Sequence, residues 1–388
     1  MARLPDCFYN ILFGVLLYSL FFSGSSFAET DVERRLRILE ERFESQSKKT
    51  EWLDRFSFNG DFRLRHEHQG RDPQNASNKP DRNRQRIRLR LGGVFHLYRD
   101  LDIGIRFATG GTDPLSANQT LENTAETKGI ELDRVFAEFR TGPLKLTGGK
   151  FATPFMGSEL IWDGDLSPEG AVEQISHSYG KTSLKLILGQ IVIDEISGLS
   201  DDPYLLAYQG VVSQKLSLGT VTLGLGYFQY YNLAGNTIDN DPSNSASTNT
   251  LDGTAHAFDI STMDIIGEFA WNTAVPITFF GEYATNVEDD PSLDEAWQLG
   301  LKINKKAKTT LDWQVRYLYR LVQQDAVFAN WADSDLHNGG TNYKGHEMGI
   351  DIGLRKGIIF KFTHFISKEE RGPKDNLEKS QFDLNFLF

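Results

Sequence analysis

The sequence predicts an all-β protein: a transmembrane antiparallel β-barrel of about sixteen strands behind a short periplasmic α-helical segment. Three observations predict this fold. The N-terminus carries an apolar segment with a cleavage signature, the strands alternate strictly and exceed the length of soluble strands, and tight turns alternate with long polar loops. With 39% hydrophobic and 24% charged residues, the 388-residue chain is not intrinsically disordered.

Residues 1–28 are interpreted as a secretory signal peptide. The apolar stretch Phe8–Phe22 is shorter than a membrane helix, and Ser26 and Ala28 fit the small-residue cleavage rule. An uncleaved anchor is the alternative. The single cysteine, Cys7, precedes the apolar stretch, so neither lipidation nor a disulfide framework is supported. No other window approaches a membrane helix, so entry into a membrane requires a closed barrel.

Residues 29–55 predict a periplasmic helix. Val32, Leu36, Leu39 and Phe43 are spaced four, three and four apart in a stretch rich in Glu and Arg. Two interpretations stay open for this segment: an intermolecular coiled coil, or a solvated helix that links the cleavage site to the next domain.

Residues 56–388 form the predicted barrel domain, where hydrophobicity alternates with a period of two. Each expected strand has one apolar and one polar face, and many are long enough to cross a bilayer at a tilt. The expected strands are 56–69, 84–98, 101–109, 129–140, 144–152, 170–179, 182–194, 203–216, 220–231, 256–271, 275–286, 295–304, 308–321, 344–355, 358–368 and 378–388.

The connections between these strands alternate in length. Tight turns such as 99–100, 141–143, 180–181 and 356–357 alternate with long polar stretches. An even strand number with short turns at one end is typical of outer-membrane barrels and predicts that both chain ends lie on the periplasmic side. The last strand ends on the aromatic Phe388, which resembles the C-terminal signature of bacterial outer-membrane proteins.

The charge balance excludes one class of function. The formal net charge is −12 and the isoelectric point is about 5.2, which argues against a nucleic-acid binder.

Arginines are the strongest charged feature. Alternation places those of the first three strands on one face, opposite apolar side chains that suit lipid, so they are predicted to line the lumen. Two later arginines face the same way. The predicted pore-lining residues are Arg63, Arg65, Arg84, Arg86, Arg88, Arg90, Arg106, Arg316 and Arg320. The alternative is that they only solvate the interior and pair with carboxylates.

A loop near residues 153–169, called here the third loop, is unusually apolar for an exposed segment. Folding back into the barrel mouth would bury its apolar residues and bring its carboxylates toward the arginines, forming a constriction. The constriction residues are predicted to be Glu159, Trp162, Asp163 and Asp165. An external loop packed on its neighbours is the alternative.

Catalytic signals are weak. The sequence has no Gly-x-Ser-x-Gly, no HExxH and no phosphate-binding glycine loop. His66 and His68 flank Glu67, but on a strand they fit a membrane interface better than a metal site. We therefore expect neither an enzyme nor a cofactor or metal.

Several motifs form a recognisable set. They are the signal peptide with its short helix, Arg86-Ile87-Arg88-Leu89-Arg90-Leu91-Gly92, the run from Gly111 to Leu121, Leu132-Asp133-Arg134, Gly149-Lys150-Phe151 with Pro154-Phe155, and the run from Trp162 to Gly170. With these motifs the chain resembles the family of putative bacterial porins, over nearly the whole mature chain and most densely before residue 175. The resemblance implies a passive outer-membrane channel, trimeric like other large porins. It assigns no solute and no residue roles.

The sequence thus predicts an outer-membrane porin: a water-filled channel for passive diffusion of small hydrophilic solutes or ions. The arginine wall favours anions. Expected partners are outer-membrane lipid and lipopolysaccharide, the solutes, and two further copies in a homotrimer, with no nucleic acid. The rival classes are an outer-membrane enzyme and a non-conducting anchor or adhesin barrel.

Overall fold

The structure is a computed structural model of the whole chain, and it describes residues 30–72, 81–198, 200–239, 248–288, 292–372 and 376–388. The predicted signal peptide lies outside the described residues. The chain divides into two compact units, residues 1–55 and 56–388.

The described part of the first unit is helix α2, Asp31–Asp54. It begins with a capping box, because the Thr30 hydroxyl accepts from the Glu33 N–H while the Glu33 carboxylate accepts from the Thr30 N–H. Leu36 and Leu39 on the predicted apolar stripe are 56% and 62% exposed. Within the described residues, no helix is long and apolar enough to cross a membrane.

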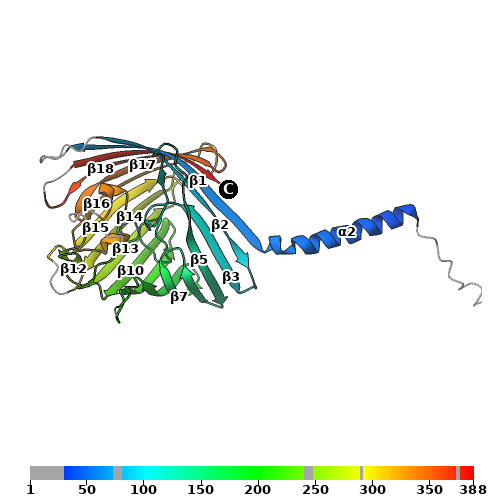
Figure 1. Cartoon of the computed structure of the whole chain (residues 1–388), viewed down its shortest axis with the longest axis horizontal. Helices are drawn as coiled ribbons and strands as arrows, with labels where there is room; N and C mark the ends of the chain where they lie inside the picture. Colours follow the sequence, from blue (N-terminus) through cyan, green and yellow to red (C-terminus); the bar gives the residue numbers. More distant parts are fainter. Residues whose placement is uncertain (1–29, 73–80, 199, 240–247, 289–291, 373–375) are drawn as a thin grey trace, which may run out of the picture. The chain divides into compact units, whose positions relative to one another are not determined.

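The second unit is an antiparallel barrel in which sixteen long strands follow one another in chain order (Figure 1). The predicted number of strands is confirmed. The strands are β1 Phe56–Asp72, β2 Arg82–His96, β3 Leu101–Thr109, β5 Ile130–Thr141, β6 Leu144–Lys150, β7 Glu169–Tyr179, β8 Thr182–Val192, β9 Tyr204–Lys215, β10 Gly219–Tyr231, β13 Ile260–Trp271, β14 Ile277–Asn286, β15 Glu295–Ile303, β16 Trp313–Val322, β17 Tyr343–Arg355, β18 Ile358–Glu369 and β19 Asn376–Leu387.

Pairing of the first and last strands closes the barrel. β1 pairs with β19 antiparallel, from Asp61 opposite Leu387 to Asp72 opposite Asn376. The Gly60 and Phe388 backbones extend this ladder with two further hydrogen bonds, of 2.8 and 3.1 Å. Closure leaves no open sheet edge, which a strand in lipid could not tolerate.

Three short strands lie outside this ring. β4, Gln119–Thr120, adds to β2, whereas β11, Leu251–Asp252, and β12, Ala255–His256, form a separate hairpin.

Two expected strands begin four or more residues later than predicted. β13 starts at Ile260 rather than at residue 256, because His256 pairs in the β11–β12 hairpin. β16 starts at Trp313 rather than at residue 308. The Asp312 carboxylate accepts hydrogen bonds from the Lys308 and Thr309 N–H groups and so closes a turn that ends the alternation early.

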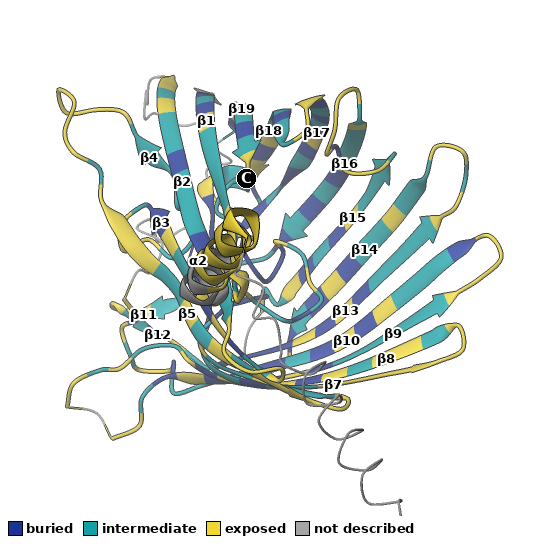
Figure 2. Ribbon diagram, turned by 90° about the vertical axis from the view of Figure 1, so that its right-hand side faces the viewer, coloured by how far each residue is buried: buried dark blue, intermediate teal, exposed yellow. Residues whose placement is uncertain are grey.

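Exposure alternates along the strands, as Figure 2 shows by colour. On β8, Leu184, Leu186 and Leu188 are 47–59% exposed, whereas Ile187 and Ile191 are at most 1% exposed. Outward residues are apolar and suit lipid, and inward residues are either polar or covered by interior loops.

The apolar core lies inside the barrel, where the third loop, residues 151–168, meets the loop of residues 323–342. The latter contains two short 3-10 helices, η1 Ala329–Trp331 and η2 Leu336–Asn338. Trp162 packs against Phe155, Phe228 and Trp331 at ring-centroid distances of 5.2, 5.1 and 5.7 Å. Burial of each large aromatic side chain contributes on the order of 2–3 kcal/mol, which holds both loops against the wall.

Candidate functional site

The inward face of β1 and β2 carries the arginine ladder, defined here as Arg63, Arg65, Arg84, Arg86, Arg88 and Arg90. The register sets Arg63 opposite Arg88 and Arg65 opposite Arg86. The outward Leu64 between them is 42% exposed, whereas Arg65 is only 6% exposed. Strand alternation therefore directs the whole ladder into the barrel.

Strand carboxylates pair with most of the ladder. Asp61 accepts from Arg88 at 3.0 Å and from Arg90 at 2.7 Å. Asp383 of β19 binds Arg65 at 2.7 Å and lies 3.6 Å from Arg63.

Glu67 is the carboxylate that pairs with the arginines at the other end of the ladder. It pairs with Arg84 and lies 3.9 Å from Arg86. Arg86 also donates to the Asn118 carbonyl at 3.2 Å.

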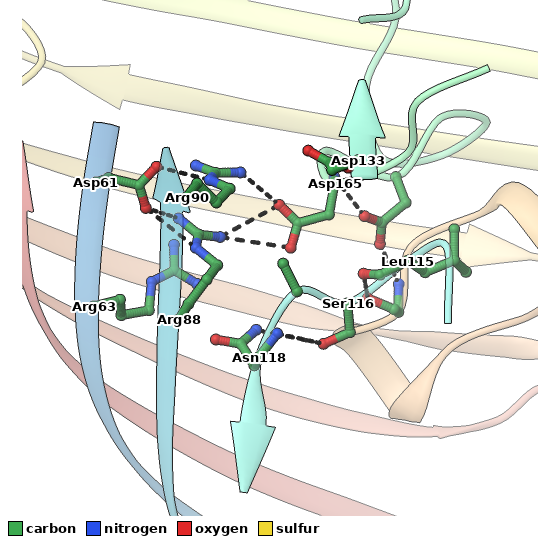
Figure 3. A network of polar contacts seen from close by, with 12 residues as sticks. Asp61, Arg63, Arg88, Arg90, Leu115, Ser116, Asn118, Asp133 and Asp165 are labelled. Atoms are coloured by element: carbon green, nitrogen blue, oxygen red, sulfur yellow. Dashed lines mark hydrogen bonds and ion pairs between the residues drawn. The ribbon is translucent and has the colours of Figure 1, made fainter. Parts of the chain in front are cut away.

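The third loop reaches this ladder through Asp165. Figure 3 shows its carboxylate approaching Arg88 and Arg90 from the side opposite Asp61, at 3.3 and 3.0 Å. Burial raises the pKa of Asp165, but the charges of Arg88 and Arg90 outweigh it, so the pKa lies below its ordinary value. Asp165 is therefore a fixed negative charge beside the ladder.

The 323–342 loop reaches the ladder through Asp335. Its carboxylate lies 3.7 Å from Arg65 and accepts from Gln381 at 2.7 Å. Burial opposes ionisation, yet Arg65 and Lys379 hold the pKa of Asp335 below its ordinary value. Both interior loops thus place a carboxylate on the arginines.

The other end of the third loop is acidic. Glu159 and Asp163 lie beside Asp333 of the 323–342 loop, whose N–H donates to the Glu159 carbonyl at 2.9 Å. Enclosure in the barrel and the charges of Asp333 and Glu347 raise the pKa of Glu159 well above its ordinary value. The Glu159 side chain remains exposed to the lumen, so water there weakens the contribution of burial.

Asp163 is buried where the two loops meet. Its carboxylate accepts from the Asp165 N–H at 2.7 Å and the Ser334 N–H at 2.9 Å. Burial and the nearby Asp333 raise the pKa of Asp163 to about 7. The charge on this loop junction therefore changes near neutral pH.

Three predicted pore-lining arginines lie away from the ladder. Arg106 pairs with Asp133 on β5. Arg316 binds Glu347 at 2.7 Å.

Arg320 faces inward but is only 1% exposed, since it pairs with Asp333 and donates to Gln298 at 3.0 Å. Trp162, predicted in the constriction, is 4% exposed because it packs in the aromatic core. Both therefore hold the loops in place rather than facing open water.

Sequence reasoning predicted Asp165 near the arginines but did not name the strand carboxylates that pair with the ladder. Asp61 and Glu67 alternate on the same face as Arg63 and Arg65, so strand periodicity could have revealed them. Asp383 required knowledge of the β1–β19 closure. The 323–342 loop folds into the barrel and brings Asp335 to Arg65. In the sequence, only its apolar run at residues 326–332 indicates that it is buried.

The arrangement can act on ions but offers no evident catalytic set. Among the described residues, no three or more His, Cys, Asp or Glu side chains gather in a metal-binding arrangement. His66 and His68 point outward and contact Gln85 and Asn83 at 2.7 and 2.9 Å. The charged groups of this site lie along the third loop, which contacts β2 through Asp165 and β14 through Ser158.

Comparison with known proteins identifies relatives by family and by fold. The family model described as putative porin matches residues 72–261 and 249–388. No curated protein sequence matches the chain.

Solved structures share the fold. The high-pH structure of Pseudomonas putida OprB aligns with a TM-score of 0.59 at 13% identity, over 89% of this chain and 97% of that one. The low-pH structure of the same protein aligns with a TM-score of 0.51 at 10% identity, over 88% and 97%.

The raised pKa of Asp163 predicts a pH-dependent stability. A raised carboxyl pKa contributes stability that is complete below the ordinary value near 4 and is lost as pH rises through about 7. Asp165 and Asp335 shift the other way, and their contributions change only below about pH 4. The folded barrel should therefore be more stable at pH 5 than at pH 8, by on the order of 2–3 kcal/mol from Asp163.

Thermal unfolding of Asp163→Asn and of the exposed-loop control Asp201→Asn, each at both pH values, measures this contribution. Asp163→Asn should reduce the difference between pH 5 and pH 8, and Asp201→Asn should retain it. An unchanged difference in Asp163→Asn would contradict the assignment.

Proposed function

This chain belongs to the family of putative porins, and on that basis we propose that it forms a water-filled channel for passive diffusion of small hydrophilic solutes or ions across the bacterial outer membrane. The observation that carries the proposal is the combination of a closed sixteen-strand barrel with a charged inward face. Barrels of this strand number are wide enough to leave an aqueous passage.

The two rival classes are less well supported. An enzyme would need a nucleophile and a base close together, and the arginines of the ladder are instead paired with carboxylates. A non-conducting anchor or adhesin would need a filled lumen. Both the matching family and the solved neighbours are porins, which favours a channel over either rival.

Conductance across a planar bilayer tests the proposal directly. Purified full-length protein should give stepwise increases in current, because each inserted barrel adds one or more aqueous pathways. Protein denatured by heating serves as the control. Folded protein that inserts without any conductance step would refute the channel.

We also propose that the channel prefers anions, and that the preference is modest. The six arginines of the ladder contact five carboxylates, Asp61, Glu67, Asp165, Asp335 and Asp383, which leaves a small positive excess. Wall charges should dominate the energy of a passing ion, since salt screens charges beyond roughly 8–10 Å. The acidic loops outside the barrel then contribute little.

Reversal potentials in a salt gradient measure this preference. Changing Arg86, Arg88 and Arg90 together to Gln should lower the chloride-to-potassium permeability ratio by about twofold or more. Asp61→Asn should raise the ratio, because it frees Arg88 and Arg90 from one carboxylate, and Asp201→Asn should leave it unchanged. If the triple variant keeps the original ratio, the ladder does not set selectivity.

We propose further that the chain assembles as a homotrimer in contact with lipid and lipopolysaccharide, with both chain ends in the periplasm. An even number of strands and short turns at one end support this placement. In helix α2, Val32, Leu36 and Leu39 are 56–72% exposed. Burying them between three copies as a coiled coil would remove apolar surface from water.

Deleting residues 31–50 tests the coiled-coil contribution. The deletion should lower the temperature at which trimer bands disappear on an unheated gel, because the helices would no longer join the subunits. Replacing Leu36 and Leu39 with Ala should have the same, smaller effect, and Arg35→Ala on the exposed face should have none. Trimer bands of undiminished heat resistance in the deletion variant would rule out this role.

A further inference from the structure

Two carboxylates buried in the barrel wall form no ion pair among the described residues. Asp264 on β13 is 0% exposed and Glu282 on β14 is 4% exposed. The register sets Asp264 opposite Ala284 and Glu282 opposite Ile266, so the two are diagonal neighbours on the inward face. Diagonal neighbours on one face of a sheet lie about 7–8 Å apart, so two ionised carboxylates here would repel each other.

Three of the four carboxylate oxygens of this pair accept no hydrogen bond from the described residues. Neither Asp264 oxygen has a hydrogen-bond partner among the described residues, and neither does Oε1 of Glu282. Oε2 of Glu282 accepts from the Ser158 hydroxyl of the third loop and from Gln298 at 3.0 Å. Buried carboxylates are ordinarily paired, protonated or bound to a metal.

The nearest arginine is already engaged. Arg320 pairs with Asp333 and donates to the Gln298 carbonyl, so its charge is taken up by another carboxylate. Arg320 also attracts Glu282, but because it is shared with Asp333, two ionised carboxylates would keep an excess of negative charge here. A bound ion of charge +2 would balance them.

The surroundings of the pair suit a small ion bound by oxygen. Asp264 lies opposite Gly226 on one neighbouring strand and Ala284 on the other. The Phe228 ring lies over Gly226, so a short side chain flanks the carboxylate only on the Ala284 side. The oxygens present are two from Asp264, one free oxygen of Glu282 and the Ser158 hydroxyl. Hard cations, and calcium in particular with its flexible geometry, prefer such ligands.

We propose that Asp264 and Glu282 bind a calcium ion beneath the third loop, and that this ion fastens the loop to the wall at Ser158. Water and backbone oxygens would complete the coordination shell, since two carboxylates alone are too few. The ion would strengthen an attachment that the Met156 backbone already makes with Gln209, whose side chain accepts from the Met156 N–H at 2.7 Å. This site is separate from the arginine ladder and does not depend on conduction.

Calcium chloride titrated into the full-length chain by calorimetry tests the site. The protein is refolded from inclusion bodies into detergent, so that no lipopolysaccharide contributes binding, and is first treated with a chelator. One calcium ion should bind per chain and raise the temperature of thermal unfolding. Asp264→Asn and Glu282→Gln should each weaken binding at least tenfold.

The matched control is Asp351→Asn. Asp351 is also a buried, inward carboxylate, but it has its own cations, Lys361 at 3.0 Å and Arg316 at 3.4 Å. This variant should bind calcium as the natural chain does. If Asp264→Asn does not refold, Glu282→Gln and Ser158→Ala test the same site with Asp264 intact, and Ser158→Ala should bind more weakly.

Two results would overturn the proposal. Equal calcium binding by the natural chain and by the Asp264 and Glu282 variants would mean that binding lies elsewhere. A natural chain whose unfolding temperature responds to neither calcium nor chelator would mean that no calcium ion neutralises the pair. Neither result would bear on conductance, so the channel proposal is tested independently.

Discussion

The rest of this structure depends on satisfying every backbone hydrogen bond of a sheet placed in lipid. A flat sheet would expose two unpaired edges, and the β1–β19 ladder removes both. Closure also divides the side chains into two environments, because alternation sends one half outward and the other inward. The outward half can be apolar throughout. Charged residues are then confined to the lumen, where they concentrate on a few strands.

Inside the barrel, charge is balanced locally rather than across the whole chain. The arginine ladder is nearly neutralised by three strand carboxylates and by Asp165 and Asp335, one from each interior loop. On the far side, Glu159 and Asp333 share the fully buried Arg320 as their cation. The net charge of −12 therefore says little about the field that a solute would meet.

The third loop joins these two sides. Asp165 holds it to β2, Ser158 holds it to β14, and the aromatic cluster around Trp162 fixes the middle. Apolar packing is insensitive to pH and salt, whereas both ends depend on charged groups. The two ends of the loop can therefore respond differently to protons and cations while its middle stays in place.

Strand periodicity alone determined the sixteen strands, the tight turns and the inward direction of the arginines, because a period of two is a local property of the chain. It could also have placed Asp61 and Glu67 beside Arg63 and Arg65. Strand periodicity could not predict the pairing of Arg65 with Asp383. These residues are separated by 318 positions and meet only because β1 pairs with β19 to close the barrel. The same holds for Asp264 and Glu282, whose burial depends on a loop from a distant hairpin. Local alternation fixes which way a side chain points, but only the tertiary structure decides what it meets there.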